Sequence, residues 1–156
     1  MSATCEAGDP APDFNLELAP GKRVALNEFR GKKLVLYFYP KDDTSGCTAE
    51  AIAFNGLRKQ FAKAGAAVLG VSPDPIKTHE KFKLKHDLSI PLAADEDKAA
   101  ATAYGVWVEK SMYGRKYMGV ERSTFLIGPD GKIARAWRKV KVNGHAEEAL
   151  AAARAL

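Results

Sequence analysis

The chain has 156 residues, 46% of them hydrophobic and 28% charged, with a net charge of +5. This length fits one folded domain, residues 1–156, and two cysteines are too few for a disulfide framework. No apolar stretch reaches the length of a membrane span, and the N-terminal MSATCEAGDP lacks the apolar core of a secretory leader. We therefore expect a cytoplasmic protein without membrane contact.

The positive charge raises the question of a nucleic-acid partner. Lysine and arginine are scattered along the chain, and most segments also carry aspartate or glutamate. The densest basic run, residues 135–141, is typical of the solvated face and end of a strand. We expect no nucleic-acid partner. The alternative is weak, salt-sensitive binding of polyanions, which retention on nucleic acid at varied salt would test.

The N-terminal half predicts a hairpin, two buried strands and a helix between them. Alternating apolar residues on either side of an Ala-Pro-Gly-Lys turn predict a β-hairpin within residues 10–33. The continuous apolar runs at 34–39 and 66–72 predict central strands covered on both faces. Between them, residues 48–64 carry apolar side chains at helical spacing, which predicts a helix that Gly65 ends.

The C-terminal half predicts further helices and strands. We expect Ile76, Phe82 and Leu84 to face the core from the first of these helices. The expected helices lie at 75–86, 97–104 and 144–155, and the expected strands at 90–95, 122–128 and 133–137, the last two joined by a turn. We expect residues 105–120 to form a loop, which contains Trp107, Met112, Tyr113, Tyr117 and Met118.

This order of elements indicates the fold class. Strands that alternate with helices imply parallel, right-handed crossovers, and the closing hairpin adds antiparallel strands. The sequence therefore predicts an α/β protein of thioredoxin-like architecture, with a mixed central sheet flanked by helices and an N-terminal β-hairpin.

The three histidines predict no metal site. His79, His86 and His145 lie far apart in the sequence, and none has metal-ligand spacing with a cysteine or a second histidine. We expect His79 and His86 on solvated helix faces and His145 near the start of the last helix. The absence of a Cys-x-x-Cys motif disfavours a disulfide oxidoreductase of thioredoxin type.

Cys47 stands between a buried strand and a helix, in the stretch YPKDDTSGCTAEAI. A thiol reacts as its thiolate, and the first turn of a helix supplies free N–H groups and the positive end of the helix dipole. Thr44 and Ser45 are suitable N-cap residues, and their hydroxyls could also bond a sulfur or an incoming oxygen. The position therefore predicts a reactive cysteine.

Three neighbours of this cysteine fit a reactive site. Gly46, without a side chain, would leave the approach to the sulfur open, and Pro40 would fix the loop and shield the thiolate from water. Glu50, three residues after the cysteine, could orient a cation. The alternative is an inert buried cysteine that packs as a small hydrophobic residue.

These residues resemble those of a known family. Pro40, Thr44 and Cys47 form Pro-x-x-x-Thr-x-x-Cys, which looks like the active-site motif of the peroxiredoxins. The segment GDPAPDFNL resembles the family's N-terminal segment. YGVWVEKSMYGRKYMGVERSTFLIGPDGKI is similar to the later segment of its bacterioferritin comigratory, or Q-type, branch. The resemblance covers nearly the whole chain, in order and without large insertions.

The resemblance implies a peroxiredoxin-type thioredoxin fold and a thiol peroxidase that needs no metal or organic cofactor. By position, Cys47 matches the peroxidatic cysteine, Thr44 the threonine that hydrogen-bonds the peroxide, and Pro40 the shielding proline. Arg122, in ERSTF, matches the arginine that faces the thiolate. Glu50 falls where many members have an acidic or amide residue near that arginine. Without the resemblance, Arg122 would be interpreted as a surface strand residue.

The chain departs from this branch at its second cysteine. Many Q-type members carry one five residues after the first, where Ile52 stands here, and others carry one in the following helix, where residues 81–87 have none. Ser45 also departs, because the motif often has a proline there. We expect Cys5 to be an exposed bystander in a mobile tail; the alternative is an unusual resolving thiol, in the same chain or across a dimer.

We therefore expect a peroxidase for hydrogen peroxide and organic hydroperoxides that forms a sulfenic acid on Cys47. An external thiol of thioredoxin, glutaredoxin or glutathione would then reduce the sulfenic acid. The alternative reductant is the thiol of Cys5. The rival is a redox-sensing or holdase protein on the same fold with little turnover, and peroxide consumption with a thiol reductant separates the two. Many Q-type members are monomers, so we expect a monomer, with a dimer as the alternative.

Overall fold

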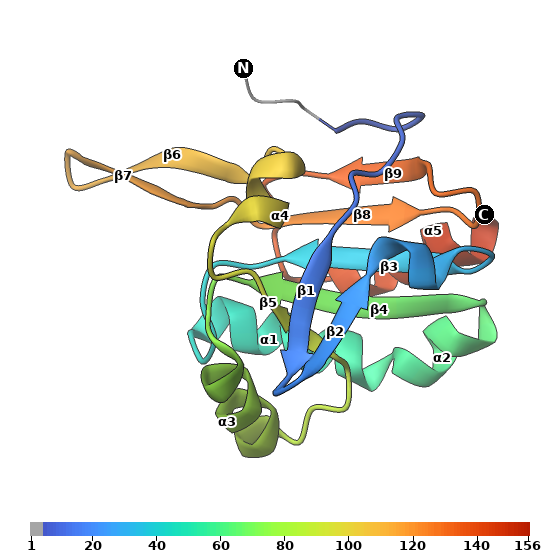
Figure 1. The fold of residues 1–156 in the computed structure, drawn as a ribbon, viewed down its shortest axis with the longest axis horizontal. Helices are drawn as coiled ribbons and strands as arrows, with labels where there is room; N and C mark the ends of the chain where they lie inside the picture. The colour runs from blue at the N-terminus through green and yellow to red at the C-terminus, as the bar shows by residue number, and fades with distance from the viewer. Residues whose placement is uncertain (1–4) are drawn as a thin grey trace.

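The computed structural model describes residues 5–156, so the first four residues of the N-terminal segment considered above lie outside the described range. Its centre is a seven-stranded sheet in the order β2-β1-β5-β4-β3-β8-β9 (Figure 1). The strands of this sheet are β1 (Asn15–Ala19), β2 (Lys22–Ala25), β3 (Lys33–Phe38), β4 (Ala66–Ser72), β5 (Leu92–Ala94), β8 (Ser123–Ile127) and β9 (Ile133–Trp137).

Helices cover both faces of the sheet. They are the 3-10 helix η1 (Leu26–Phe29) and the α-helices α1 (Ser45–Gly56), α2 (Arg58–Lys63), α3 (Ile76–His86), α4 (Ala99–Ala103) and α5 (His145–Ala155). β3 runs parallel to β4, and β4 parallel to β5, whereas β8 and β9 join antiparallel. The N-terminal strands β1 and β2 form an antiparallel hairpin. The predicted mixed sheet, flanking helices and N-terminal hairpin are therefore confirmed.

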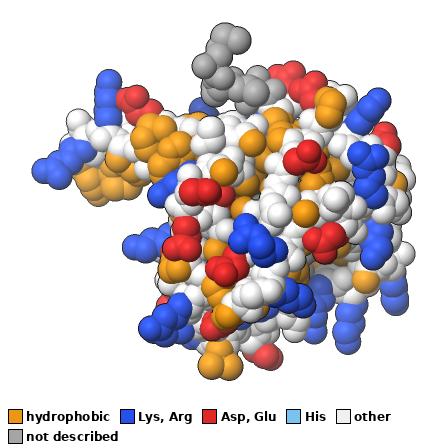
Figure 2. Space-filling model, in the orientation of Figure 1, with side chains coloured by type: hydrophobic (Ala, Val, Ile, Leu, Met, Phe, Trp, Pro, Cys, Tyr) orange, Lys and Arg blue, Asp and Glu red, His pale blue; other side chains and the backbone are white. Residues whose placement is uncertain are grey.

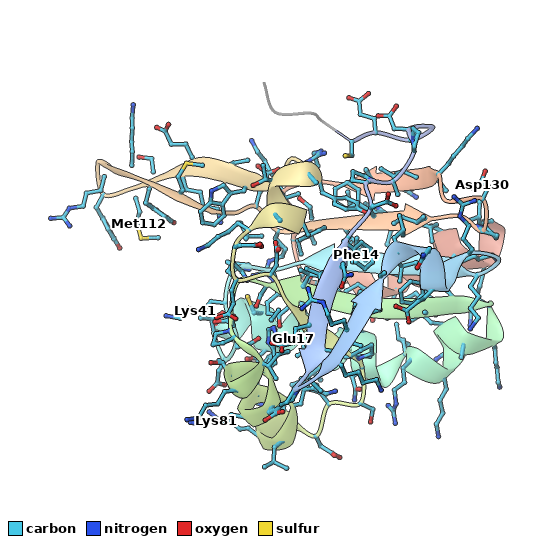
Figure 3. All side chains as sticks on the ribbon, in the orientation of Figure 1. Phe14, Glu17, Lys41, Lys81, Met112 and Asp130 are labelled. Carbon is cyan, nitrogen blue, oxygen red and sulfur yellow. The ribbon has the colours of Figure 1, made fainter. Side chains whose placement is uncertain are left out.

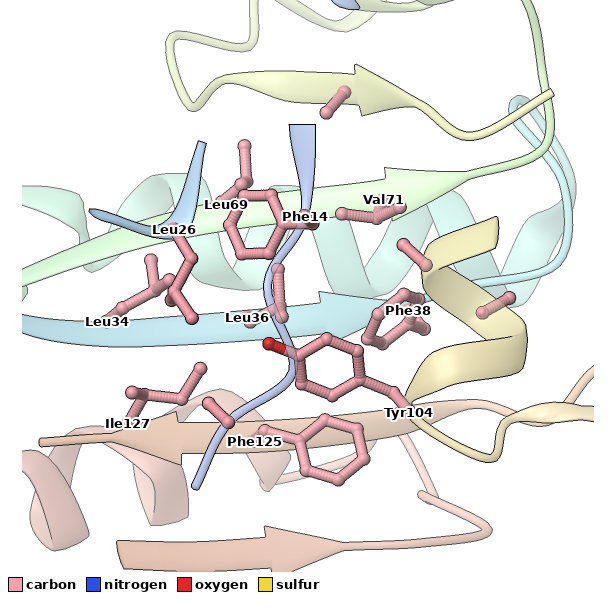
Figure 4. Close-up of a cluster of buried hydrophobic side chains, with 14 of the residues drawn as sticks. Phe14, Leu26, Leu34, Leu36, Phe38, Leu69, Val71, Tyr104, Phe125 and Ile127 are labelled. Carbon is pink, nitrogen blue, oxygen red and sulfur yellow. The ribbon is translucent and has the colours of Figure 1, made fainter. Parts of the chain in front are cut away.

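Successive side chains of β3 face two different cores, because neighbouring residues of a strand point to opposite faces of a sheet. The first, which we call the hairpin-side core, includes Phe14, Leu26, Leu36, Phe38, Tyr104 and Phe125 (Figure 4). The second, which we call the helix-side core, includes Val35, Tyr37, Cys47, Phe54, Phe61 and Leu150. The apolar run predicted as a central strand is thus buried on both faces.

Two predicted elements differ from the structure. The expected loop at 105–120 is a hairpin of β6 (Trp107–Met112) and β7 (Arg115–Val120), which form a separate two-stranded sheet. Tyr113 and Gly114 turn the hairpin with φ angles of 52° and 76°, a geometry usually signalled by Asn-Gly. The helix expected at 48–64 is two helices, because the Leu57 N–H between them bonds the Phe54 carbonyl, three residues back instead of four.

The β6–β7 hairpin projects from the body as an arm (Figure 1). Its exposed hydrophobic side chains include Met112, Tyr113, Tyr117 and Met118. Figure 2 shows hydrophobic side chains on this arm together with lysine or arginine at its tip. Exposure on both faces removes the in-and-out alternation that marks a half-buried strand, which explains why the sequence pattern indicated a loop. Among residues 5–156, no helix is long and apolar enough to cross a membrane.

Two further expectations about burial were wrong. Leu84, expected to face the core, is 86% exposed, whereas Ile76 and Phe82 of the same helix are buried. His79, expected on a solvated face, is 2% exposed, and His145, which does begin the last helix, is 5% exposed. Ile76, His79 and Phe82 follow one another at intervals of three residues, so their side chains share one face of α3.

The same substitution, leucine to alanine, made separately at Leu36 and at Leu84 tests this burial pattern. Leu36→Ala should lower the free energy of unfolding by about 2–5 kcal/mol, because it leaves a cavity in the hairpin-side core, where Leu36 is fully buried. Leu84→Ala, the matched control, should change it by less than about 0.5 kcal/mol. Urea denaturation of both variants gives the two values, and equal effects would contradict the burial described here.

Candidate active site

The central strand brings Cys47 and Arg122 together. β3 pairs with β8, so that Phe38 lies opposite Ser123. The loop at 39–44 leaves β3 at this end of the sheet and enters α1, while Arg122 directly precedes β8. Two residues that are 75 positions apart in the sequence therefore meet at one end of the sheet.

Cys47 lies in the first turn of α1, whose N-cap residue is Thr44. The Thr48 N–H donates to the Thr44 carbonyl at 2.8 Å, whereas the preceding N–H groups of this turn have no acceptor within the helix. These N–H groups and the helix dipole place partial positive charge beside the sulfur. Because Cys47 is only 1% exposed, this field acts on the sulfur with little screening by water.

Arg122 bonds two groups of α1 with its two terminal nitrogens. Nη2 donates to the Cys47 sulfur at 3.3 Å, and Nη1 donates to Oε1 of Glu50 at 2.6 Å. Burial alone would lower the pKa of the guanidinium, but the charges of Glu50 and Cys47 outweigh it and raise that pKa. A Cβ atom at Gly46 would lie 3.2 Å from Nη2, so the glycine leaves room for this contact.

Glu50 is buried one turn after the cysteine, and its side chain is 2% exposed. Burial raises the pKa of Glu50 to about 7, although the Arg122 cation opposes this shift. Its second oxygen, Oε2, has no hydrogen-bond partner within the described residues. Glu50 therefore titrates near neutral pH, and it does so beside the guanidinium that contacts the cysteine.

The other predicted site residues lie around this centre but do not touch the sulfur through a hydrogen bond. The Thr44 hydroxyl donates to the Lys41 carbonyl at 2.8 Å, which leaves its oxygen lone pairs to accept. Ser45 is exposed at the first position of α1, and Pro40 is half-buried in the loop. All three therefore lie in or next to the loop that leads from β3 to the first turn of α1.

Cys5 is neither exposed nor in a free tail, contrary to the expectation. It is 5% exposed, its thiol donates to the Ala103 carbonyl at 3.5 Å, and its own carbonyl accepts from Nη2 of Arg138 at 3.0 Å. Burial raises the pKa of the Cys5 thiol, with Arg138 opposing. Cys5 packs in the hairpin-side core and Cys47 in the helix-side core, so the two thiols lie on opposite faces of the sheet.

The structure places further polar groups beside the loop at 39–44. Asp42 and His79 are both buried, and Oδ2 of Asp42 lies 2.6 Å from Nδ1 of His79. The sequence analysis did not select either residue for the site. The regular spacing of Ile76, His79 and Phe82 was the signal that could have placed the histidine on the buried face.

One group of side chains has the ligand types of a cation site. Single ligand atoms of Asp42, Asp74 and His79 all lie within 4.8 Å of one another. Both ring nitrogens of His79 already face protein acceptors, Oδ2 of Asp42 and the Ala93 carbonyl at 3.0 Å. A metal ligated by the histidine would have to displace one of these bonds, so we interpret the group as a hydrogen-bonded cluster.

The arrangement as a whole is suited to nucleophilic chemistry at sulfur. A thiolate in this position would be next to a permanent cation, the free N–H groups of a helix start and a carboxyl that titrates near pH 7. The same donors would face a reacting atom brought close to the sulfur, and they could stabilise negative charge as it moves.

Comparison with known proteins agrees with this geometry. The model of the AhpC/TSA family matches residues 7–136. The chain is 50% identical to peroxiredoxin Bcp of Xanthomonas campestris pv. campestris, over 92% of this chain and 89% of that protein. It is 48% identical to peroxiredoxin Bcp of Bacillus subtilis, over 94% of each chain.

Solved structures give the same family. A cysteine-to-serine variant of PrxQ from Xylella fastidiosa superposes with a TM-score of 0.92 at 43% identity, covering 98% of both chains. A structure of the Xanthomonas campestris bacterioferritin comigratory protein, studied for alkyl peroxide reduction, gives a TM-score of 0.89 at 47% identity, over 96% of this chain and 98% of that one. The chain therefore belongs to the AhpC/TSA family and, within it, to the Bcp or Q-type peroxiredoxins, which are thiol-dependent peroxidases.

Proposed function

We propose that Cys47 is the peroxidatic cysteine and that its thiolate attacks the terminal oxygen of a hydroperoxide, R–O–O–H. A sulfur–oxygen bond forms and the oxygen–oxygen bond breaks, with the electron pair going to the leaving oxygen. The leaving alkoxide takes a proton to give R–OH, and Cys47 becomes a sulfenic acid. The contact between Arg122 and both Cys47 and Glu50 is the observation that carries this proposal.

The surrounding groups have distinct roles in this step. Arg122 and the N–H groups at the start of α1 stabilise negative charge on the sulfur and then on the leaving oxygen. The Thr44 hydroxyl, which lies in the approach to the sulfur, holds the peroxide by hydrogen bonding. Pro40 shields the thiolate from water, while Gly46 and Ser45 leave a path to it and supply N–H groups.

Glu50 acts through Arg122 and not on the peroxide itself. Its Oε1 fixes the orientation of the guanidinium, so that Nη2 faces the sulfur. Its charge state also sets the net charge of the centre: an ionised Glu50 neutralises part of the field of Arg122, and a protonated Glu50 restores that field. With a pKa of about 7, this carboxyl changes its charge in the neutral range.

We propose that the sulfenic acid is reduced by an external thiol and not by Cys5. The sheet separates the two sulfurs, and the raised pKa of Cys5 disfavours its thiolate. A first external thiol condenses with the sulfenic acid, which forms a mixed disulfide and releases water. A second thiol then frees Cys47 and leaves as a disulfide. Thioredoxin, glutaredoxin and glutathione each provide such thiols.

Substrate, assembly and location follow from the same features. Hydrogen peroxide and organic hydroperoxides are the proposed substrates, in line with the alkyl peroxide reduction of the Xanthomonas campestris relative. Cys47, Glu50 and Arg122 come from one chain, which supports a monomer as the working unit. Both cysteines are free thiols, which supports a reducing compartment such as the cytoplasm.

Serine variants of the two cysteines test the proposed cycle. Cys47→Ser should abolish peroxide consumption in the presence of excess thiol, while Cys5→Ser should keep it within about twofold of the wild type. In intact-mass spectra of peroxide-treated protein, wild type and Cys5→Ser should both gain oxygen on Cys47. A disulfide between Cys5 and Cys47 would contradict external reduction, and consumption of a single equivalent of peroxide would indicate a redox sensor.

Arg122→Lys tests whether the geometry of the guanidinium matters beyond its charge. Lysine keeps the positive charge but cannot bond the sulfur and Glu50 together, so the rate of Cys47 oxidation by peroxide should fall about 100-fold. Arg135→Lys, an exposed arginine of β9, is the control and should leave the rate unchanged.

Equal rates for wild type and Arg122→Lys would overturn the assigned role of the arginine. A mixture of Cys47→Ser and Arg122→Lys also tests the working unit. Each protein should keep its own activity in the mixture, whereas recovery of full activity would show that the site is shared between chains.

Glu50→Gln should change how stability depends on pH. The folded-state pKa of about 7 lies above the ordinary value of 4.5, so the folded protein binds this proton more tightly than the unfolded chain. The contribution of this proton to the free energy of unfolding is fully present below about pH 4.5 and is lost as the pH rises to about 7. Relative to Glu50→Gln, the wild type should therefore lose roughly 3 kcal/mol of unfolding free energy over that range.

Urea denaturation at several pH values between 4 and 8 measures this difference. Glu80→Gln, at an exposed position of α3, is the control and should follow the wild type at every pH. Parallel stability curves for wild type and Glu50→Gln would contradict the raised pKa of Glu50.

A further inference from the structure

A buried hydrogen-bonded pair lies behind the loop at 39–44. The side chain of Asp42 is fully buried and that of His79 is 2% exposed, with 2.6 Å between Oδ2 and Nδ1. The Tyr39 hydroxyl donates to the other carboxylate oxygen, Oδ1, at 2.6 Å. The mechanism described above uses none of these three side chains, although two of them belong to the segment that leads into the active site.

Both ring nitrogens of His79 have hydrogen-bond partners. Nε2 lies 3.0 Å from the Ala93 carbonyl, which can only accept, so this nitrogen carries a proton. Nδ1 faces Oδ2 of Asp42, and the carboxylate is at the same time the acceptor of the Tyr39 hydroxyl. Tyr39 and His79 together therefore provide partners for both oxygens of the buried Asp42 side chain.

The pair ties together segments that are far apart in the sequence. His79 belongs to α3, the Ala93 carbonyl to β5, and Asp42 to the loop between β3 and α1. The backbone N–H of Asp42 also donates to Oδ2 of Asp74, at 2.8 Å, which holds the loop to the end of β4. Figure 3 shows Lys41 of this loop and Lys81 of α3 at the same end of the molecule.

The position of this loop matters because it carries the approach to Cys47. Asp42 lies between Pro40 and Thr44, and the Thr44 hydroxyl bonds the carbonyl of Lys41, the neighbour of Asp42. Thr44 is also the N-cap residue of α1, so the loop sets where the first turn of this helix begins. Displacing Asp42 would move the peroxide-binding hydroxyl relative to the sulfur.

We propose that His79 is a positioning residue for peroxide reduction: through its hydrogen bond to Asp42, it holds the Pro40–Thr44 loop in the geometry that receives the peroxide. This inference rests on the proposed function of Cys47. His79 does not touch the substrate and acts through Asp42. Its effect should therefore appear in reactions that need the loop and be absent from reactions that need only the thiolate.

The same loop offers a matched control on its outer side. Asp43 accepts from Nζ of Lys85 at 2.8 Å and lies 3.0 Å from Nε2 of His86, and both contacts also join the loop to α3. The Lys85 side chain is 61% exposed, and surface ion pairs of this kind contribute little. Lys85→Gln therefore removes a loop-to-α3 contact while leaving the buried pair intact.

Two rates measured on the same variant test the proposal. His79→Gln should slow the oxidation of Cys47 by hydrogen peroxide by between about 10-fold and 100-fold, because a small misplacement of the loop removes the orientation of the peroxide. Alkylation of Cys47 by iodoacetamide, which needs the thiolate but not the peroxide-binding loop, should stay within about twofold of wild type. Lys85→Gln should leave both rates unchanged.

Two other outcomes for His79→Gln contradict the proposal. Unchanged oxidation in His79→Gln would show that the histidine does not position the loop. Equal losses in both reactions would assign His79 to the fold or to the thiolate. If wild-type Cys47 is not oxidised by peroxide at all, the proposed function fails instead, and that result is distinguishable because it involves no variant of His79.

Asp42→Asn tests the same contact from the other side and does not depend on how a His79 variant folds. Asparagine keeps the shape of the side chain but weakens the hydrogen bonds to His79 and Tyr39. Oxidation of Cys47 by hydrogen peroxide should therefore slow, while alkylation by iodoacetamide stays within about twofold of wild type. Unchanged oxidation in Asp42→Asn would overturn the proposal.

Discussion

Arg122 joins two groups that would each be costly to bury alone, the Cys47 sulfur at 3.3 Å and the Glu50 carboxylate at 2.6 Å. Because the guanidinium is a planar fork, the bond to Glu50 also fixes the nitrogen that faces the sulfur. The cation and the carboxyl therefore act as one unit, and the charge on the carboxyl decides how much of the positive field reaches the cysteine. A lysine in this place would supply charge without that orientation.

The rest of the fold makes this contact possible. Arg122 reaches α1 because β8 runs antiparallel beside β3, so that the residue before β8 meets the loop after β3. The loop after β3 belongs to no helix or strand, so contacts of its side chains with other elements hold its position. Asp42 secures its inner side through His79, while Asp43 contacts Lys85 on its outer side. Burial makes the inner contact the stronger constraint, because a polar group left without its partner there would find no water.

The sequence predicted the elements whose patterns follow from burial, namely the central strands, the N-terminal hairpin and the helix that begins beside Cys47. It could not reveal the β6–β7 hairpin, because an arm exposed on both faces has no periodic apolar pattern. The position of Arg122 came only from a family resemblance, since nothing local distinguishes it from a surface strand residue. His79 was misplaced because histidine is usually exposed, although its spacing from Ile76 and Phe82 indicated the buried face.

The two cysteines show why the surroundings of a thiol matter more than its burial. Both are at most 5% exposed, and each has an arginine nearby. At Cys5, however, the guanidinium bonds the backbone carbonyl and the thiol donates to another carbonyl, a contact that only the protonated form can make. At Cys47 the sulfur accepts from the guanidinium, a contact that strengthens as negative charge builds on sulfur. Similar burial is therefore combined with a contact that favours the protonated thiol on one face of the sheet and with a contact that favours negative charge on sulfur on the other.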